Sequence, residues 1–400
     1  MSNRLWIGVV VAALSAGANG AVAQGLAPSE APAQSAAAMA AEVRVAFDAQ
    51  GVTASAARGL ADRASGRAVS DADPVRIASI SKLVVALGVM RMVEAGELDL
   101  DADVTQYLGW RVRNPAFPDV PVTLRQLLSH RSGLTDPDEY RVPLGDRLAD
   151  VIARPALWDA QHAPGRHFRY SNVAFPVIAS VMERAGRARF DRLMQRHVFA
   201  PLGLDACFNW STCSDAKIAR HVVLYRASGE VALDDLAGKR PDCPVIARQG
   251  CDLAGYRLGE NGALFSPQGG LRASMRDLAA IGAMLIRNDG SFLKPASIAT
   301  LERVAWRFDG ANGDTGGGFY CQYGLAVTTQ PTRRDGCDDD LFGDGRTRIG
   351  HAGEAYGLRS GLWIDRAAGT GVAFFATATP PVSKGRSAFS VEEERLAKEK

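Results

Sequence analysis

The chain has 400 residues, of which 47% are hydrophobic and 22% charged, a composition typical of a globular protein with a sizeable core. Its net charge of +2 and its lack of long Lys or Arg runs give no reason to expect nucleic acid or an anionic membrane as a partner.

The first residues have the pattern of a secretory signal. Arg4 supplies a positive charge, residues 5–16 an apolar stretch, and residues 21–23 the cleavage sequence Ala-Val-Ala. A membrane anchor is the alternative, but this stretch is short and interrupted by glycine. We expect a signal peptide over 1–23, a flexible leader over 24–40, no later transmembrane segment, and a periplasmic or secreted protein.

Strand patterns lie near both ends of the chain. Residues 43–47 alternate apolar and polar side chains, and residues 52–57 follow a turn as the return strand. Residues 357–364 and 371–378 flank another turn in the same way. The stretch between them contains mainly helical patterns, so we expect an α+β fold with one sheet built from both termini and a helical region inserted.

The first of the predicted helices carries a candidate nucleophile. Apolar residues recur at helical spacing from Leu83 to Val93, so a buried helix is expected to begin near Ser79. Lys82 follows Ser79 by three residues, which places the hydroxyl and the amine on one face of that helix. A lysine activates a serine when burial lowers its pKa, and the apolar run supplies that burial. The alternative is a helix-capping serine followed by a surface lysine.

Further helices are expected over residues 123–130, 173–185, 190–198 and 275–286. Thr123 is the expected cap of the first of these. The main domain is expected to span 41–380. Residues 381–400 form a charged tail, of which 391–400 are expected to be exposed or disordered.

Six cysteines point to an oxidising compartment. Sequence permits fifteen pairings, and the sequential one is the most economical because each bond closes a short loop. A zinc site is the alternative, although no Cys-x-x-Cys spacing occurs. The cysteines are Cys207, Cys213, Cys243, Cys251, Cys321 and Cys337.

Three short motifs occur in order along the chain. They are Ser79-Ile80-Ser81-Lys82, Tyr170-Ser171-Asn172 and His351-Ala352-Gly353. Together they resemble the motifs of the serine β-lactamase and penicillin-binding-protein superfamily, in particular the branch of class C β-lactamases, D-alanyl-D-alanine carboxypeptidases and related esterases. Additional stretches are similar to this branch: 124–134, 201–204 and 269–271. The resemblance implies a β-lactamase/transpeptidase-like fold with an antiparallel sheet.

The resemblance also implies roles for individual residues. Ser79 would be the nucleophile, Lys82 its activating partner and Tyr170 a second proton carrier. Asn172 would bind Lys82 or the substrate amide. His351 and Gly353 would lie on the strand at the edge of the cleft, and the backbone N–H groups of Ser79 and Glu354 would form the oxyanion hole.

One motif departs from the antibiotic-hydrolysing relatives, which carry Lys-Thr/Ser-Gly where this chain has His351-Ala352-Gly353. Ala352 has no hydroxyl and a histidine is mostly neutral at pH 7, so a strong site for a substrate carboxylate is not expected there. Arg272 and Arg359 are other candidate sources of the missing charge.

We therefore interpret the chain as an exported serine hydrolase that cleaves a small ester, amide or peptide through an acyl-enzyme on Ser79, with no cofactor. One alternative is a true β-lactamase or D-Ala-D-Ala carboxypeptidase. Another is a non-catalytic binding protein on the same fold. We expect His130 to be structural. The other histidines, His162, His167, His197 and His221, show no metal-site spacing, so no metal is expected.

Overall fold

The structure, a computed structural model, describes residues 41–136, 141–381 and 383–399. The predicted signal peptide and leader lie outside these residues, so both stay predictions. Within the described residues, no helix is long and apolar enough to cross a membrane.

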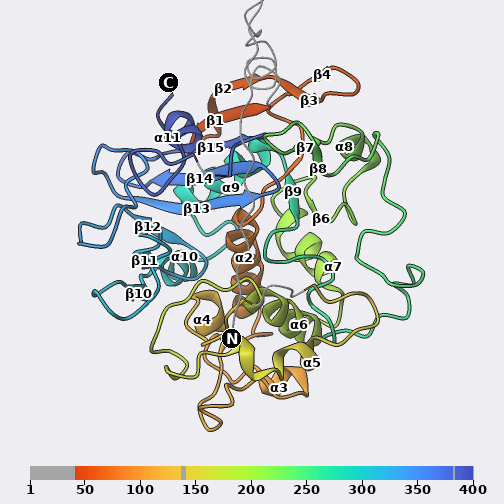
Figure 1. Ribbon diagram of the computed structural model, residues 1–400, viewed down its shortest axis with the longest axis vertical. Coiled ribbons are helices and arrows are strands. Elements are labelled where there is room, and N and C mark those ends of the chain that lie inside the picture. The colour runs from red at the N-terminus through yellow and green to blue at the C-terminus, as the bar shows by residue number, and fades with distance from the viewer. Residues whose placement is uncertain (1–40, 137–140, 382, 400) are drawn as a thin grey trace, which may run out of the picture.

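An eight-stranded sheet forms one half of the molecule (Figure 1). Its strands are, from edge to edge, β10 (Trp306–Arg307), β11 (Gln322–Tyr323), β12 (Thr328–Gln330), β13 (Arg348–Ala355), β14 (Leu358–Asp365), β15 (Thr370–Ala376), β1 (Glu42–Asp48) and β2 (Val52–Arg58). Neighbouring strands run antiparallel. β1 pairs with β15 along its whole length, so the prediction of one antiparallel sheet built from both ends is confirmed.

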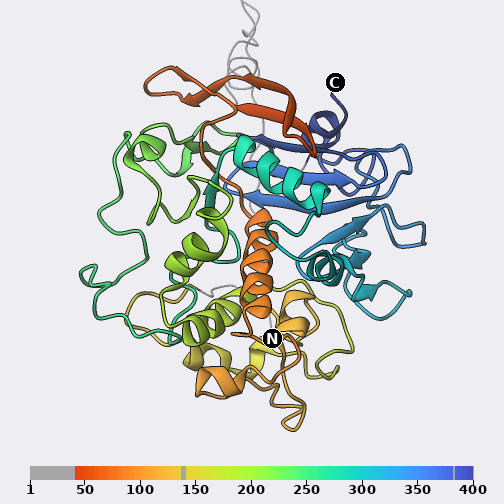
Figure 2. The same ribbon diagram turned by 180° about the vertical axis from the view of Figure 1, so that it is seen from behind.

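Two helices cover opposite faces of this sheet. Successive side chains of a strand point to opposite sides, so Phe375 packs with α9 (Met275–Arg287) while Phe374 packs with α11 (Val391–Lys398). Figure 1 shows α11 in front of the strands, and Figure 2, the reverse view, shows α9 in front.

The expectation that residues 391–400 are exposed or disordered is wrong. Ser390 caps α11 with a capping box, and Leu396 and Ala397 are only 2% and 5% exposed. Arg395 pairs with Glu42 at 2.5 Å, which ties the helix to the first strand. The run of acidic residues occupies the first turn, where the helix dipole favours negative charge.

The inserted half of the molecule is helical and is organised around α2 (Ile80–Glu94) (Figure 1). Every side chain from Ile80 to Met90 is buried, as expected of a helix that is apolar on all sides. The other helices are α3 (Thr105–Leu108), α4 (Leu124–Leu128), α5 (Leu148–Ile152), η1 (Pro155–Leu157), α6 (Ala174–Gly186), α7 (Phe190–Met194), η2 (Gln195–Phe199), α8 (Asp215–Ala219) and α10 (Pro295–Glu302).

The helices expected from the sequence are present. α4 begins after Thr123, whose side chain accepts from the backbone N–H of Gln126 in a capping box, as predicted. The helix expected over 190–198 is α7 continued by the π-helical turn η2.

Three small sheets complete the fold. They are β5 (Val75–Arg76), β9 (Leu271–Ala273) and β6 (Cys207–Phe208) in one, β3 (Leu60–Asp62) with β4 (Arg67–Ala68), and β7 (Leu224–Tyr225) with β8 (Val231–Leu233). The predicted sequential cysteine pairing is confirmed. The disulfides are Cys207–Cys213, Cys243–Cys251 and Cys321–Cys337.

Candidate active site

Ser79 lies at the junction between β5 and α2. The backbone N–H of Ile77 donates to the carbonyl of Leu271 at 3.0 Å, and the N–H of Leu271 donates to Ser81 Oγ at 3.1 Å, so both sides of the junction are tied to β9. Ala78 turns the chain with a φ of 49°, a conformation that non-glycine residues rarely adopt. Ser79 occupies the N-cap position but makes no capping bond, so its hydroxyl is not used to hold the helix.

Lys82 is fully buried one turn into α2, with its ammonium group against Ser79. Its Nζ lies 3.0 Å from Ser79 Oγ and donates to Asn172 Oδ1 and to the carbonyl of Gln268, each at 2.8 Å. Burial lowers the pKa of Lys82 to about 7, with Asp136 acting to raise it and Arg76 to lower it. In the neutral amine, those two acceptors take both N–H groups, so the lone pair faces the hydroxyl of Ser79.

Asp136 fixes the orientation of Asn172. Its carboxylate accepts from Asn172 Nδ2 at 2.8 Å, and from the backbone N–H groups of Asn172 at 2.7 Å and Val173 at 3.0 Å. Because a carboxylate can only accept, the NH₂ of Asn172 must face Asp136 and its Oδ1 must face Lys82. Asp136 also accepts from Ser171 Oγ at 3.1 Å, and it therefore holds the start of α6 beside α2.

The ring of Tyr170 is held between two other rings. It stacks on Tyr320 with centroids 4.6 Å apart at 11°, and it lies 4.3 Å from the ring of His130. Lys82 Nζ lies 4.9 Å from the centroid of Tyr170. The structure thus brings Ser79, Lys82, Tyr170 and Asn172 into one cluster.

The third motif approaches Ser79 through the backbone of Gly353. A Cβ on Gly353 would lie 2.4 Å from the carbonyl oxygen of Ile77, 2.5 Å from Ser360 Oγ and 3.2 Å from the backbone nitrogen of Ser79. Only glycine therefore fits, and this close approach brings β13 against the Ser79 junction. The side chain of Glu354 is exposed and pairs with Arg359 at 2.5 Å, so Arg359 already has a carboxylate partner.

His351 lies on β13, but its side chain is buried and does not face the surface. It is 1% exposed, and burial followed by the charge of Lys82 lowers its pKa to about 3. Its ring belongs to a series of buried hydrogen bonds that also includes His130 and Tyr323.

These buried hydrogen bonds join the second motif to the third. The N–H of Ser171 donates to His130 Nδ1 at 3.1 Å, so Nε2 of His130 carries the proton and donates to the hydroxyl of Tyr323 at 3.2 Å. Tyr323 in turn donates to His351 Nε2 at 2.8 Å, and His351 Nδ1–H donates to the carbonyl of Ala352 at 2.6 Å. The donor and acceptor groups of each of these side chains are therefore fixed, and both histidines are neutral. We call His130, Tyr323 and His351 the buried relay.

A cavity of about 510 Å³ is lined in part by Gln268, whose carbonyl accepts from Lys82. Arg76, Tyr356, Val245 and Leu264 are among the residues that line it. Arg272 also lines it, but its guanidinium pairs with the buried Asp234 at 2.9 Å, so this arginine is already neutralised.

Several residues of the site are not predicted by the sequence motifs. Asp136, Gln268, Tyr320 and Tyr323 carry no local signal. Asp136 stands 36 residues before Asn172, and Gln268 stands 186 residues after Lys82. Their contacts exist only because the fold brings distant segments together.

The profile of the family described as Beta-lactamase matches residues 22–396 of the chain. The chain belongs to the β-lactamase family. Esterase EstB of Burkholderia gladioli is 36% identical over 166 residues, which cover 38% of this chain and 42% of the esterase. A D-aminopeptidase of Cereibacter sphaeroides is 27% identical over 237 residues, which cover 57% of this chain and 40% of that protein. The matched segments thus span less than half the length of these curated relatives.

Solved structures show the same fold. The structure titled EstCE1, a hydrolase with promiscuous acyltransferase activity, superposes with a TM-score of 0.65 at 21% identity, covering 91% of this chain and 96% of that chain. The predicted β-lactamase/transpeptidase-like fold is therefore confirmed.

Proposed function

We propose that this protein is an exported serine hydrolase that cleaves an ester or amide through an acyl-enzyme on Ser79. The observation that carries the proposal is the environment of Lys82, whose two fixed acceptors and lowered pKa direct a neutral amine at the serine hydroxyl. A family of hydrolases, together with relatives named esterase and D-aminopeptidase, supports the same reaction class.

In the acylation step, Ser79 Oγ attacks the carbonyl carbon while its proton passes to Lys82. The oxyanion that forms accepts hydrogen bonds from the backbone N–H groups of Ser79 and Glu354. The tetrahedral intermediate then collapses, and the leaving group takes a proton from the Lys82–Tyr170 pair. In the second half-reaction water attacks the acyl-enzyme and gives a proton to the same pair, which returns it to Ser79 Oγ as the C–O bond to the serine breaks and the acid is released.

The substrate class we favour is an uncharged ester or a D-amino-acid amide. A substrate carboxylate needs a paired charge or good donors, or its desolvation is uncompensated. On β13, Ala352 offers no hydroxyl and His351 stays neutral, while Arg272 and Arg359 already pair with Asp234 and Glu354.

A non-catalytic binding protein on this fold has no need to keep Ser79, Lys82 and Tyr170 in contact, so we regard that alternative as the weaker one. The test is hydrolysis of p-nitrophenyl butyrate and D-alanine p-nitroanilide by the purified protein. We expect turnover of at least one, and a loss of about 10³-fold or more in Ser79→Ala. The exposed Ser65, changed to Ala, is the matched control and should keep full activity. Equal rates in the two variants would exclude Ser79 as the nucleophile.

A further inference from the structure

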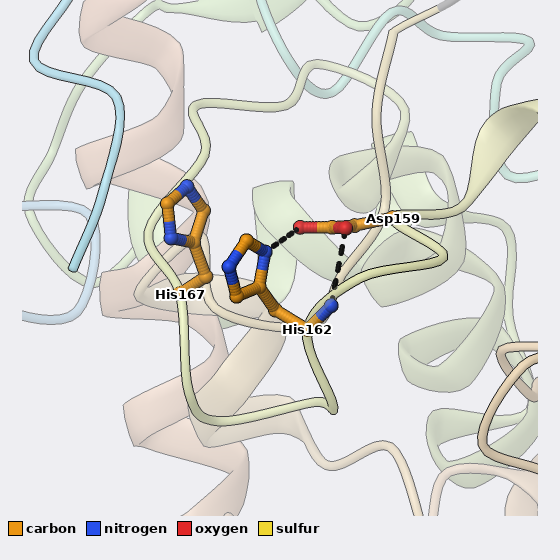
Figure 3. Close-up of side chains that lie close together, drawn as sticks. All are labelled: Asp159, His162 and His167. Atoms are coloured by element: carbon orange, nitrogen blue, oxygen red, sulfur yellow. Dashed lines mark hydrogen bonds and ion pairs between the residues drawn. The ribbon is translucent and has the colours of Figure 1, made fainter. Parts of the chain in front are cut away.

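A second cluster of chemically active side chains lies apart from Ser79, on the loop that leads to Tyr170. Asp159, His162 and His167 converge there (Figure 3), and each offers one potential ligand atom within 4.8 Å of the other two. Backbone bridges from Trp158 to Leu134 and from Phe168 to Gly313 fix both ends of this loop to the rest of the fold.

The carboxylate of Asp159 is preorganised. Its Oδ1 accepts from the backbone N–H groups of Gln161 at 2.8 Å and His162 at 3.2 Å, while its Oδ2 lies 2.8 Å from His162 Nδ1. The rings of His162 and His167 stack with centroids 4.1 Å apart. Figure 3 shows the two rings and the carboxylate converging from one short stretch of chain.

These distances suit a small metal ion. Two metal bonds of roughly 2.1 Å at the tetrahedral angle place their ligand atoms about 3.4 Å apart. The Asp159–His162 contact is 2.8 Å, so these two ligand atoms need to separate only slightly to admit an ion. A metal ion can replace the hydrogen that lies between Asp159 Oδ2 and His162 Nδ1. His162 then carries its proton on Nε2, so the ring loses no proton overall.

His167 must then turn its ring out of the stack so that one nitrogen faces the ion. His167 is only partly buried and the neighbouring side chain of His162 is 40% exposed, so the ring of His167 can turn toward solvent. Two imidazoles and one carboxylate favour borderline divalent transition metals over Ca²⁺ or Mg²⁺, which prefer oxygen ligands. Water would fill the remaining positions.

We infer that Asp159, His162 and His167 form a binding site for one divalent transition metal ion. The histidine spacing alone gave no indication of it, because the loop between His162 and His167 folds back and Asp159 supplies the third ligand. Tyr170 follows His167 by three positions, so the bound ion stabilises the loop that presents Tyr170.

The test is calorimetric titration of the full chain, without an affinity tag, with Zn²⁺ at pH 7.5. We expect one ion per chain, and binding at least tenfold weaker in His162→Gln and in His167→Gln. A saturating excess of Zn²⁺ should raise the Tm by roughly 3–5 °C. Co²⁺ should give visible absorption bands that both variants lose.

Two controls separate this site from other possibilities. His197→Gln removes a half-buried histidine elsewhere and should bind Zn²⁺ like the parent. Ser79→Ala should also bind normally, so the metal result stands apart from the proposed hydrolysis. Absence of stoichiometric binding, or unchanged binding in both His162→Gln and His167→Gln, would show that the cluster is only a hydrogen-bonded pair with a stacked ring.

Discussion

Asp136 sets the orientation in which Asn172 meets Lys82. Its carboxylate binds the Asn172 amide nitrogen at 2.8 Å, and the amide oxygen on the other side accepts from Lys82 at 2.8 Å. Through Asn172 the carboxylate therefore positions Lys82, and through its charge it also raises the pKa of Lys82.

The first prediction concerns the pH dependence of hydrolysis. Neutral Lys82 is the form that accepts a proton, and its pKa is lowered to about 7. We therefore expect kcat/KM for p-nitrophenyl butyrate to rise with pH and to level off above an apparent pKa near 7. A profile that is flat from pH 5 to pH 9 would contradict a neutral lysine base.

Two charge-neutralising variants should move the midpoint of the kcat/KM–pH profile in opposite directions. Asp136→Asn removes the charge that raises the Lys82 pKa, so the midpoint should fall. Arg76→Gln removes a charge that lowers it, so the midpoint should rise. Asp289→Asn, at a half-exposed position after α9, is the control and should leave the profile unchanged. Shifts of the same sign in the first two variants would refute this electrostatic account.

The buried relay is expected to position the site. Tyr323→Phe leaves the Nε2 donor of His130 and the Nε2 acceptor of His351 without their partner. We expect kcat to fall roughly 10- to 100-fold, equivalent to about 1–3 kcal/mol, with little change in KM.

The matched control for the relay is Tyr225→Phe. That hydroxyl accepts from the N–H of Arg63 at 3.0 Å and contacts Asp62 at 3.3 Å, away from the nucleophile. The free energy of unfolding should fall in both variants, whereas kcat should fall only in Tyr323→Phe. If kcat stays at the parental value in Tyr323→Phe, the relay supports the fold and not the reaction.

Local sequence patterns predicted the first residues of this site, but they did not predict the side chains that pack around them. Ser79 and Lys82 lie one turn apart in an apolar run, so spacing alone indicated both their proximity and the lowered lysine pKa. Nothing near His351 showed that its ring is buried against Tyr323, because the two are joined only by the pairing of β11, β12 and β13.

The prediction that residues 391–400 are exposed or disordered failed for a related reason. The acidic first turn of α11 has the composition of an exposed tail, but Leu396 and Ala397 come one turn later on the face that meets the sheet. The partner of that face, around Trp363 and Phe374, could not be identified before the strand order was known.

Substrate preference provides a further prediction. We expect a higher kcat/KM for p-nitrophenyl butyrate than for nitrocefin at pH 7.5. Ala352→Thr should raise nitrocefin turnover relative to ester turnover by about one to two decades, the value of a charge-assisted hydrogen bond of roughly 1.5–3 kcal/mol.

Lowering the pH to 5 should not raise kcat/KM for nitrocefin relative to kcat/KM for the ester. The pKa of His351 is about 3, so its ring stays neutral at that pH. Efficient nitrocefin hydrolysis by the parent, unaffected by Ala352→Thr, would mean that the carboxylate is held elsewhere in the cleft.

The most direct test of the central claim is covalent capture of the nucleophile. A p-nitrophenyl phosphonate ester should release one p-nitrophenolate per chain and leave one phosphonyl group. Intact-mass and peptide analysis should locate that group on Ser79, with no labelling in Ser79→Ala and much slower labelling in Lys82→Arg. Stoichiometric labelling of Ser79→Ala, or a label found on another residue, would contradict the account.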